Sequence, residues 1–312
     1  MTNAPPPLVS VCVCTYKRPM LLAKLLDSLA SQAIEDNFTY EVVVVDNDKT
    51  GSARVVVEAA QKRYPGLALT YAIEHIQGIS YARNRTVALG RGEFLAFIDD
   101  DEQASPRWLF NLFETMNRHQ ADAVFGPVLA EYPPGTSKWM IKSRLFERPR
   151  YANGTRLTSG DGRTGNALVR AEWATRRKPA PFDSQLAHSG GEDYDFFKWM
   201  ASEGGRLVWS DTATVSEIVP QQRQSLKFIL ERRFRASLTY WRGINMQRPH
   251  WRSIPEAFAG ATGGVLFAVL GLLAIPFGFH LSARCWVKSM NGFGRVAALT
   301  SLRPIGYGEI HD

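Results

Sequence analysis

The sequence predicts an α/β fold in which helices cover a mainly parallel β-sheet. Short apolar runs of strand length alternate with helical segments through roughly the first 135 residues, the pattern of consecutive βαβ units. Three of these runs end in polar residues, as strands do where their carboxyl ends line a ligand site. With 312 residues, 45% apolar and 21% charged, the chain can bury a sizeable core and is not expected to be disordered.

Five strands and four helices are expected in this first part of the chain. The valine-rich run 7–16 predicts a strand buried on both faces, and leucines at helical spacing predict a helix over 18–32. Ser105 and Pro106 suit the cap and first position of a helix that ends at about Gln120. The same reasoning gives strands at 40–48, 67–75, 93–102 and 121–132, and helices at 52–64 and 78–92.

The alternation becomes looser in the C-terminal half. Residues 164–173 predict a strand, 190–205 a helix and 206–220 an extended segment, before a long basic helix at 225–247. We therefore expect one α/β domain over residues 1–222. The region 223–312 is expected to hold the basic helix and an apolar helical segment that associates with a membrane.

That apolar segment runs from Ala257 to Phe279, and its 23 uncharged residues are enough to span a bilayer. Five glycines and Pro276 leave two alternatives open, a buried helical hairpin and a helix lying in the membrane interface. Basic residues on both sides do not assign an orientation. The first ten residues lack the pattern of a secretory signal, so we expect a cytosolic main domain, attached peripherally or by a single span.

Polar residues at the strand ends are the first functional signal. Ligands of parallel sheets bind at the carboxyl ends of the strands, and this rule brings together 15–18, 46–48 and 99–102. No G-x-G-x-x-G follows the first strand, which argues against a nicotinamide or flavin enzyme, and no G-x-x-x-x-G-K-[ST] occurs. A phosphate would therefore be held by a divalent metal on carboxylates together with arginines.

The run Asp99-Asp100-Asp101-Glu102 is the candidate metal site. Alternate residues of an extended strand share a side, so Asp99 and Asp101 are expected to point together and Asp100 toward the scaffold. Such a pair offers hard oxygen ligands to Mg²⁺ or Mn²⁺. The alternative is a solvated acidic turn that caps the next helix, and Glu102 alone fits that description.

Six segments, in this order over roughly residues 8–200, resemble the family 2 glycosyltransferases of GT-A fold, a Rossmann-like nucleotide-diphospho-sugar transferase domain. The segments are VSVCVCTYKRP, VVVVDNDKTG, GISYARNR, FLAFIDDDE, TGNALVR and GGEDYDFF. Within the family they are most similar to bacterial exopolysaccharide enzymes of the succinoglycan type, which add glucose to a lipid-linked oligosaccharide. The resemblance implies a UDP-sugar donor, a divalent metal and a hexosyltransferase reaction.

The resemblance also implies the residues of the site. Asp101, with Asp99, would ligate the metal, and Asp193 would be the general base. Because Asn47 stands where a second acid is usual, the contact with the uracil N–H is shared between Asp46 and Asp48. The positions implied for the nucleotide sugar are Thr15 and Tyr16 at the base, Asp46, Asp48, Arg83 at the base or diphosphate, Asp99 at the ribose, and Arg18 and Asp100 beside them.

Three groups of residues near the expected site allow two interpretations each. Adjacent side chains on a helix diverge by about 100°, so one of Glu192 and Asp193 is expected to face the site; alternatively both stabilise a helix N-terminus. Gly165 and Asn166 fit a sugar pocket or a plain turn. Trp108 is expected in the core rather than on a sugar ring.

The expected function is therefore an inverting, metal-dependent glycosyltransferase, because one base without a nucleophile predicts inversion. The implied acceptor is a polyprenyl-diphosphate-linked oligosaccharide at the cytoplasmic face of the bacterial inner membrane. The alternatives are a polyprenyl-phosphate glycosyltransferase and a non-catalytic, sugar-nucleotide-binding protein of the membrane surface. The net charge of +7 fits anionic partners, but without an aromatic and basic motif nucleic acid is not expected.

Overall fold

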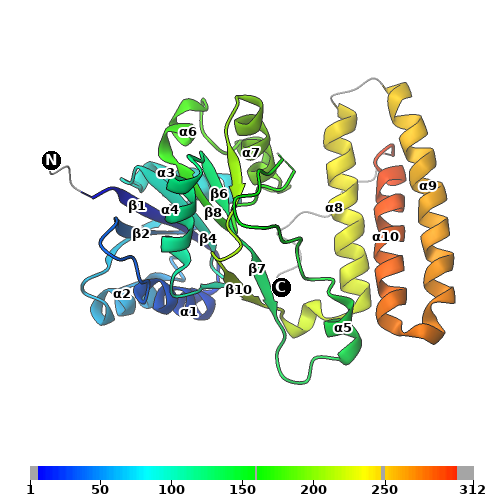
Figure 1. Cartoon of the computed structure of the whole chain (residues 1–312), viewed down its shortest axis with the longest axis horizontal. Coiled ribbons are helices and arrows are strands. Elements are labelled where there is room, and N and C mark those ends of the chain that lie inside the picture. The colour runs from blue at the N-terminus through cyan, green and yellow to red at the C-terminus, as the bar shows by residue number, and fades with distance from the viewer. Residues whose placement is uncertain (1–5, 159, 247–249, 301–312) are drawn as a thin grey trace. The chain divides into compact units, whose positions relative to one another are not determined.

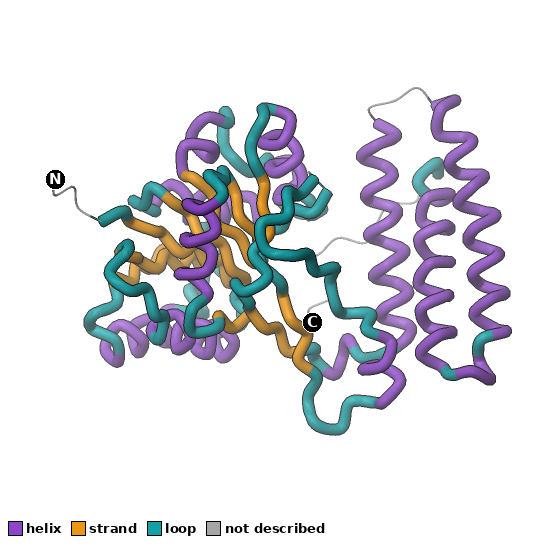
Figure 2. The backbone as a smooth tube through the Cα atoms, in the orientation of Figure 1, coloured by secondary structure: helices purple, strands orange, loops and turns teal. Residues whose placement is uncertain are grey.

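The computed structural model describes residues 6–158, 160–246 and 250–300 and divides the chain into two compact units. The first comprises Met1–Leu129 and Arg148–Glu217, and the second comprises Ala130–Glu147 and Ile218–Asp312. The second unit therefore contains the region 223–312 together with a segment from the middle of the chain. Figure 1 labels the elements, and Figure 2 distinguishes helices, strands and loops.

A seven-stranded sheet forms the centre of the first unit, in the order β3-β2-β1-β4-β8-β6-β9 (Figure 1). Its strands are β1 (Leu8–Thr15), β2 (Thr39–Asp46), β3 (Ala68–Ile73), β4 (Phe94–Asp99), β6 (Ala123–Phe125), β8 (Asn166–Arg170) and β9 (Leu207–Trp209). All neighbouring pairs are parallel except those of β8, which runs antiparallel to β4 and to β6. The prediction of a mainly parallel sheet is confirmed.

Helices cover both faces of this sheet (Figure 1). They are α1 (Pro19–Ala30), α2 (Arg54–Arg63), α3 (Ile79–Leu89), α4 (Trp108–Arg118), α6 (Ala171–Arg176) and α7 (Glu192–Ser202), with a 3₁₀ turn η1 (Ser184–Leu186). Val11 of β1 lies in the core cluster that contains the leucines of α1, whereas Cys12 lies in the cluster of Phe196 on α7. Alternate residues of β1 therefore enter opposite cores, as expected for a strand buried on both faces.

Two expected strands are interrupted. The run 93–102 forms β4 only to Asp99, turns at the next two residues, and continues as β5 (Glu102–Ala104), which pairs antiparallel with β10 (Val215–Ile218). The run 121–132 breaks between β6 and β7 (Val128–Glu131). A Cβ on Gly126 would lie 2.1 Å from the carbonyl oxygen of Ala213, and Pro127 has no N–H to donate.

The second unit is helical. It contains α5 (Lys138–Ser143), the 3₁₀ turn η2 (Gln221–Arg223), α8 (Leu226–Met246), α9 (His250–Leu273), the 3₁₀ turn η3 (Ile275–Phe277) and α10 (Phe279–Ala297). The apolar segment expected at 257–279 is most of α9 and the turn that follows it. The sequence did not predict α10, which packs against both α8 and α9. α9 and α10 together form a helical hairpin, but the segment 257–279 supplies only part of its first helix and the turn, and it is largely exposed rather than buried as that alternative required.

Within residues 6–158, 160–246 and 250–300, one helix is long and apolar enough to cross a membrane. It is Trp251–Leu273, and only 22% of its most apolar stretch is buried. Length and composition alone do not distinguish a span from other apolar helices.

Candidate functional site

The carboxyl ends of β1, β2 and β4 lie side by side at one edge of the sheet. Thr15 is in register with Asp46, and Cys14 is in register with Asp99. The half-buried Tyr16 begins the loop after β1. The sheet thus brings together three segments that lie far apart in the sequence, and polar side chains from all of them gather at this edge.

Asp100 braces the turn that follows β4. Its side chain is buried; Thr15 Oγ1 donates a hydrogen bond of 2.7 Å to one of its oxygens, and Arg18 Nη1 one of 3.1 Å to the other. Arg18 Nη1 also lies 3.1 Å from Asp101 Oδ2. Desolvation raises the pKa of Asp100 to about 6, although Arg18 opposes the shift. Asp100 does turn toward the scaffold, but through a turn rather than the strand alternation that we expected.

Arg83 on α3 joins two carboxylates from different elements. Its Nη2 lies 3.5 Å from Asp99 Oδ1 at the end of β4, and its Nη1 is ion-paired with Glu192 Oε1 at the start of α7. The guanidinium is buried and lies 5.9 Å from the ring centroid of Phe182. Arg83 therefore ties the first turn of α7 to the acidic edge of the sheet.

Glu192 and Asp193 diverge at the start of α7, as adjacent helical residues must. Glu192 is buried against Arg83, whereas Asp193 is half-buried and accepts a hydrogen bond of 2.7 Å from the backbone N–H of Tyr194. Glu192 is ion-paired with Arg83, and Arg83 lies 3.5 Å from Asp99 Oδ1, so the first turn of α7, which carries Asp193, is joined to the acidic edge. The structure thus places Asp193 beside the acidic edge, while Glu192 serves Arg83.

Glu102 does not lie where the sequence suggested. Instead of capping the next helix, it is only 1% exposed, and its Oε2 accepts a hydrogen bond of 3.1 Å from the backbone N–H of Asp99. Desolvation raises its pKa well above the ordinary value, and the charge of Asp99 adds to the shift. Burial of an acid at the end of an acidic run leaves no local sequence signal, so a contact partner was needed to reveal it.

Gly165 lets the backbone approach these acids. A Cβ there would lie 2.9 Å from Glu102 Oε1 and 3.1 Å from Asp99 Oδ2. We expect Gly165→Ala to displace Asp99 and to lower the affinity for the UDP-sugar implied by the resemblance at least several-fold, as measured by calorimetry. Gly66→Ala is the control, because nothing lies within 4 Å of a Cβ at that position. Equal donor affinity in both variants would contradict a role for Gly165 in placing Asp99.

Asn166 and Trp108 have structural contacts. Trp108 is fully buried and donates from Nε1 to Asn166 Oδ1 over 2.8 Å, which confirms that it belongs to the core. Asn166 Nδ2 donates to the carbonyl oxygens of Pro127 and Ala213 at 3.0 and 2.7 Å. Since both ends of the Asn166 amide are used, this residue joins β8 to two loops.

The carboxylates after β2 organise their own loop. Asp46 is fully buried, and it accepts hydrogen bonds from the backbone N–H groups of Asp48 (2.9 Å) and Ala53 (2.8 Å) and from the hydroxyl of Tyr71 (3.0 Å). Asp48 is buried too and accepts from the backbone N–H and the hydroxyl of Thr50. A contact of either carboxylate with a nucleotide base stays a prediction.

The edge carries an excess of negative charge. Desolvation raises the pKa of Asp99, with Asp101 adding to the shift and Arg83 opposing it. Five acids meet two arginines here: Asp99, Asp100, Asp101, Glu102 and Glu192 against Arg18 and Arg83. This imbalance favours a bound cation.

The donor set fits a divalent metal that is shared with a ligand. In the part of the chain that the structure describes, no group of three or more His, Cys, Asp or Glu side chains is arranged to hold a metal ion. Asp99 and Asp101 supply two hard oxygen donors, so the other ligands of Mg²⁺ or Mn²⁺ would be water or oxygens of the bound molecule.

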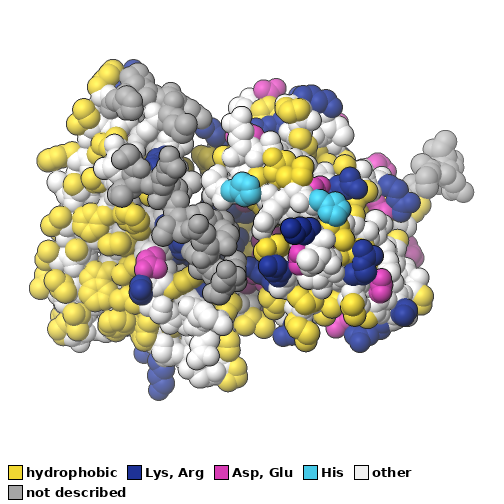
Figure 3. Space-filling view, turned by 180° about the vertical axis from the view of Figure 1, so that it is seen from behind, with side chains coloured by type: hydrophobic (Ala, Val, Ile, Leu, Met, Phe, Trp, Pro, Cys, Tyr) yellow, Lys and Arg dark blue, Asp and Glu magenta, His cyan; other side chains and the backbone are white. Residues whose placement is uncertain are grey.

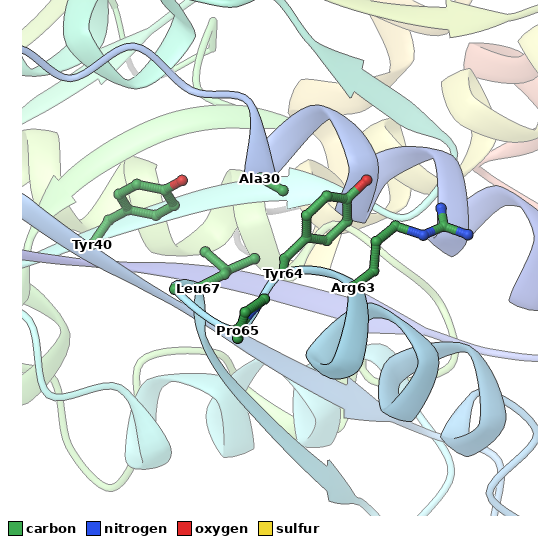
Figure 4. A pocket seen from close by; sticks show the side chains of 7 residues that line it. Ala30, Tyr40, Arg63, Tyr64, Pro65 and Leu67 are labelled. Carbon is green, nitrogen blue, oxygen red and sulfur yellow. The ribbon is translucent and has the colours of Figure 1, made fainter.

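A shallow hollow of about 350 Å³ lies elsewhere on the first unit (Figure 4). It is lined by Tyr40 at the start of β2, by Leu67 just before β3, and by Arg63 and Tyr64 at the end of α2. These positions are at the amino ends of the strands. The hollow is therefore separate from the acidic edge, which collects the carboxyl ends.

Comparison with known proteins identifies the family. Residues 10–177 match the family model described as Glycosyl transferase family 2. The chain belongs to this family. It is a family 2 glycosyltransferase, and the resemblance noted in its six sequence segments is confirmed.

Two curated family members show how far the likeness extends. The chain is 39% identical over 305 residues to the succinoglycan biosynthesis protein ExoM of Rhizobium meliloti (strain 1021), covering 95% of this chain and 94% of ExoM. It is 30% identical over 132 residues to the GalNAc(5)-diNAcBac-PP-undecaprenol beta-1,3-glucosyltransferase of Campylobacter jejuni, covering 42% of this chain and 41% of that protein. The first match extends through both compact units, whereas the second spans less than half of each chain.

The fold is also that of known glycosyltransferases. The mannosyltransferase PcManGT from Pyrobaculum calidifontis, solved in complex with GDP-Man and Mn²⁺, is similar with a TM-score of 0.61 at 18% identity. The alignment covers 95% of this family 2 chain and 88% of PcManGT. At this identity the likeness supports the fold alone, and the predicted GT-A fold is confirmed.

Proposed function

We propose that this glycosyltransferase transfers one sugar residue from a UDP-sugar to a polyprenyl-diphosphate-linked oligosaccharide, with inversion at the anomeric carbon. The sugar that we propose is glucose. The observation that carries the proposal is the acidic edge, where Asp99 and Asp101 lie with Arg18 and Arg83, and where Arg83 also holds Glu192 in the turn that carries Asp193. This edge combines donors for a metal, cations for a diphosphate and a carboxylate at the start of a helix.

Asp193 is the proposed general base. It takes the proton from the acceptor hydroxyl as the oxygen attacks the anomeric carbon, and the bond from that carbon to the diphosphate breaks with its electron pair going to the leaving oxygen. Because a single displacement is involved, an α-linked donor yields a β-linked product. Asp193 is half-buried, which leaves it reachable by an acceptor, while the buried Glu192 is held by Arg83.

Arg83 and Arg18 are proposed to interact with the departing UDP. Both guanidinium groups already lie beside carboxylates of the edge, at 3.5 Å and 3.1 Å. Asp99 and Asp101 would hold a divalent cation, which would supply charge stabilisation for the diphosphate. Thr15, Tyr16, Asp46 and Asp48 would form the surface for the nucleotide, with Asp100 holding the turn beneath it.

The relatives support the acceptor class. ExoM, similar along nearly its whole length, is named for succinoglycan biosynthesis, and the Campylobacter enzyme is named as a glucosyltransferase on an undecaprenol-linked glycan. A lipid-linked acceptor requires the protein to work at a membrane. The apolar helix α9, which follows the first unit in the sequence, could contact that membrane. We therefore propose exopolysaccharide biosynthesis at the cytoplasmic face of the bacterial inner membrane.

Donor and acceptor are tested together. Purified full-length protein is incubated with UDP-glucose, other UDP-sugars or GDP-mannose, since PcManGT holds GDP-Man, and with a polyprenyl-diphosphate oligosaccharide or polyprenyl phosphate. We expect transfer from UDP-glucose to the oligosaccharide, and a β-linkage by NMR. If sugar were transferred to polyprenyl phosphate but not to the oligosaccharide, polyprenyl phosphate would be the acceptor and the proposed acceptor would be wrong. Retention of the anomeric configuration would contradict a single displacement.

Metal removal gives a second test. We expect EDTA to abolish transfer and Mn²⁺ or Mg²⁺ to restore it, because Asp99 and Asp101 offer only two protein ligands. Asp101→Asn should raise the metal concentration needed for half-maximal rate at least tenfold, whereas Asp27→Asn, which removes an exposed carboxylate paired with Arg63, should not. Full activity in EDTA would contradict the metal site.

A further inference from the structure

The helix α9 exposes large apolar side chains on the half that faces away from α10. Phe258, Val265 and Leu272, spaced seven residues apart, are 71%, 57% and 60% exposed, and Leu266 and Leu273 beside them are 56% and 64% exposed. Figure 3 shows hydrophobic side chains gathered densely over part of the surface. A helix on a water-soluble surface has polar residues on this half, so such a surface calls for an apolar partner.

On the opposite half of α9, glycines lie at the closest approaches to α10. A Cβ on Gly260 would lie 2.9 Å from the carbonyl oxygen of Gly292, and one on Gly271 would lie 2.2 Å from the indole of Trp286. Ser289 Oγ donates a hydrogen bond of 2.8 Å to the carbonyl oxygen of Gly264. Close packing on α10 thus uses the small residues of α9 and leaves its large apolar ones outside.

Cations lie along α10 as well as at the start of α9, where Arg252 is exposed. Arg284 and Arg295 lie 11 positions apart on that helix, about 16 Å at 1.5 Å per residue, with Lys288 between them. Lys288 Nζ lies 5.0 Å from the ring centroid of Phe267, and the Arg295 guanidinium lies 3.7 Å from that of Trp241. Lys288 and Arg295 also line a groove of about 240 Å³ over the glycines of the hairpin.

These positions decide between two orientations. If α9 spanned a bilayer, α10 packed along it would bring all three cations to membrane depth, which is costly for each one. If the helix axes lie in the plane of the membrane with α9 lowest, the cations of α10 lie one interhelical distance above it, about 8–10 Å. That distance matches the depth to which interfacial helices bury their apolar face, and it places cations at the phosphates.

We propose that the second unit binds an anionic lipid surface with α9 in the acyl layer, parallel to the membrane plane, and with the cations of α10 at the lipid phosphates. Charge complementarity selects a lipid surface over a second copy of the chain, because cations border the apolar half. This inference rests on the membrane location in the proposed function. It adds the orientation of α9 and α10 relative to the membrane plane.

The first experiment is flotation of the full-length protein with vesicles, without any donor or acceptor. We expect binding to vesicles containing phosphatidylglycerol and much weaker binding to phosphatidylcholine alone. Val265→Ser combined with Leu266→Ser should weaken binding more than about tenfold, and Lys288→Gln about fivefold. Equal binding to both kinds of vesicle would overturn the role of the cations. If the protein formed a dimer in solution and did not float with vesicles, the partner of α9 would be a second copy of the chain rather than lipid.

Depth measurements test the orientation. Spin labels are placed by Phe258→Cys, Val265→Cys and Leu272→Cys, three outward positions about 10 Å apart along α9. Cys285→Ser removes a native thiol, while burial raises the pKa of the Cys12 thiol to about 12 and that of Cys14 as well, which keeps both unreactive.

We expect equal depths for the three labels in vesicles. A maximum at Val265 would indicate a span, and a steady increase toward Leu272 would indicate insertion by the tip of the hairpin; either result overturns the in-plane orientation. Both would leave the proposed membrane location intact. Absence of flotation would contradict the membrane location as well, and the donor and metal tests do not depend on any of these outcomes.

Discussion

Asp193→Asn is expected to reduce sugar transfer by roughly 10² to 10⁴-fold while leaving the affinity for UDP-glucose within about twofold. The amide cannot accept the proton of the acceptor hydroxyl, yet it preserves the size of the side chain and its hydrogen bond from the Tyr194 N–H. Asp193 is half-buried in the turn of α7 that Arg83 joins to Asp99, and it is proposed to contact the acceptor, so the loss is expected in kcat rather than in donor binding. Transfer rates and calorimetric donor affinities provide the measurement.

Asp195→Asn is the matched control. Asp195 lies in the same first turn of α7 and is ion-paired with Arg177 at 2.5 Å. It therefore offers the same negative charge to the helix N-terminus, a stabilisation of about 0.3–1 kcal/mol at such a position. If both variants lost transfer equally, Asp193 would be acting through the helix dipole rather than as the base.

Local patterns predicted the part of the fold that depends on neighbouring residues. The first four strands and the helices between them come from apolar runs that alternate with amphipathic ones, and β1, β2 and β4 end one, two and three residues before the expected positions. Because the ends of parallel strands share one edge, the same patterns also located the acidic edge. Thr15, Asp46 and Asp99 follow from this rule alone.

The remaining features depend on contacts between distant residues. Arg83 and Glu192 are 109 positions apart, and the sequence around either residue does not indicate that the two form an ion pair. Glu102 is buried because of Asp99 and Gly165 rather than because of its own neighbours in the sequence. The amphipathic helix α10 was overlooked because Arg284, Lys288 and Arg295 interrupt its apolar positions, and its packing on α9 depends on glycines whose role only the partner helix reveals.

Arg83→Met is expected to lower the free energy of unfolding by about 3–5 kcal/mol and to reduce transfer by roughly 10²-fold. The substitution leaves Glu192 buried without its cation and removes the partner of Asp99. It also frees the first turn of α7, which carries Asp193, from the acidic edge. Adding Glu192→Gln should recover part of the stability, because the unpaired buried charge is gone, but not the transfer rate.

Arg91→Met distinguishes positioning from stability. Arg91 pairs with the buried Glu41 at 2.6 Å near the amino ends of the strands, away from the acidic edge, so its loss should destabilise the fold without changing kcat. Thermal unfolding and transfer rates are measured for all variants at a temperature where each is folded. Because Arg83 also faces the proposed diphosphate, its variant should lose donor affinity as well as kcat. A normal rate and affinity in folded Arg83→Met would show that this arginine supports the structure and has no part in placing Asp193.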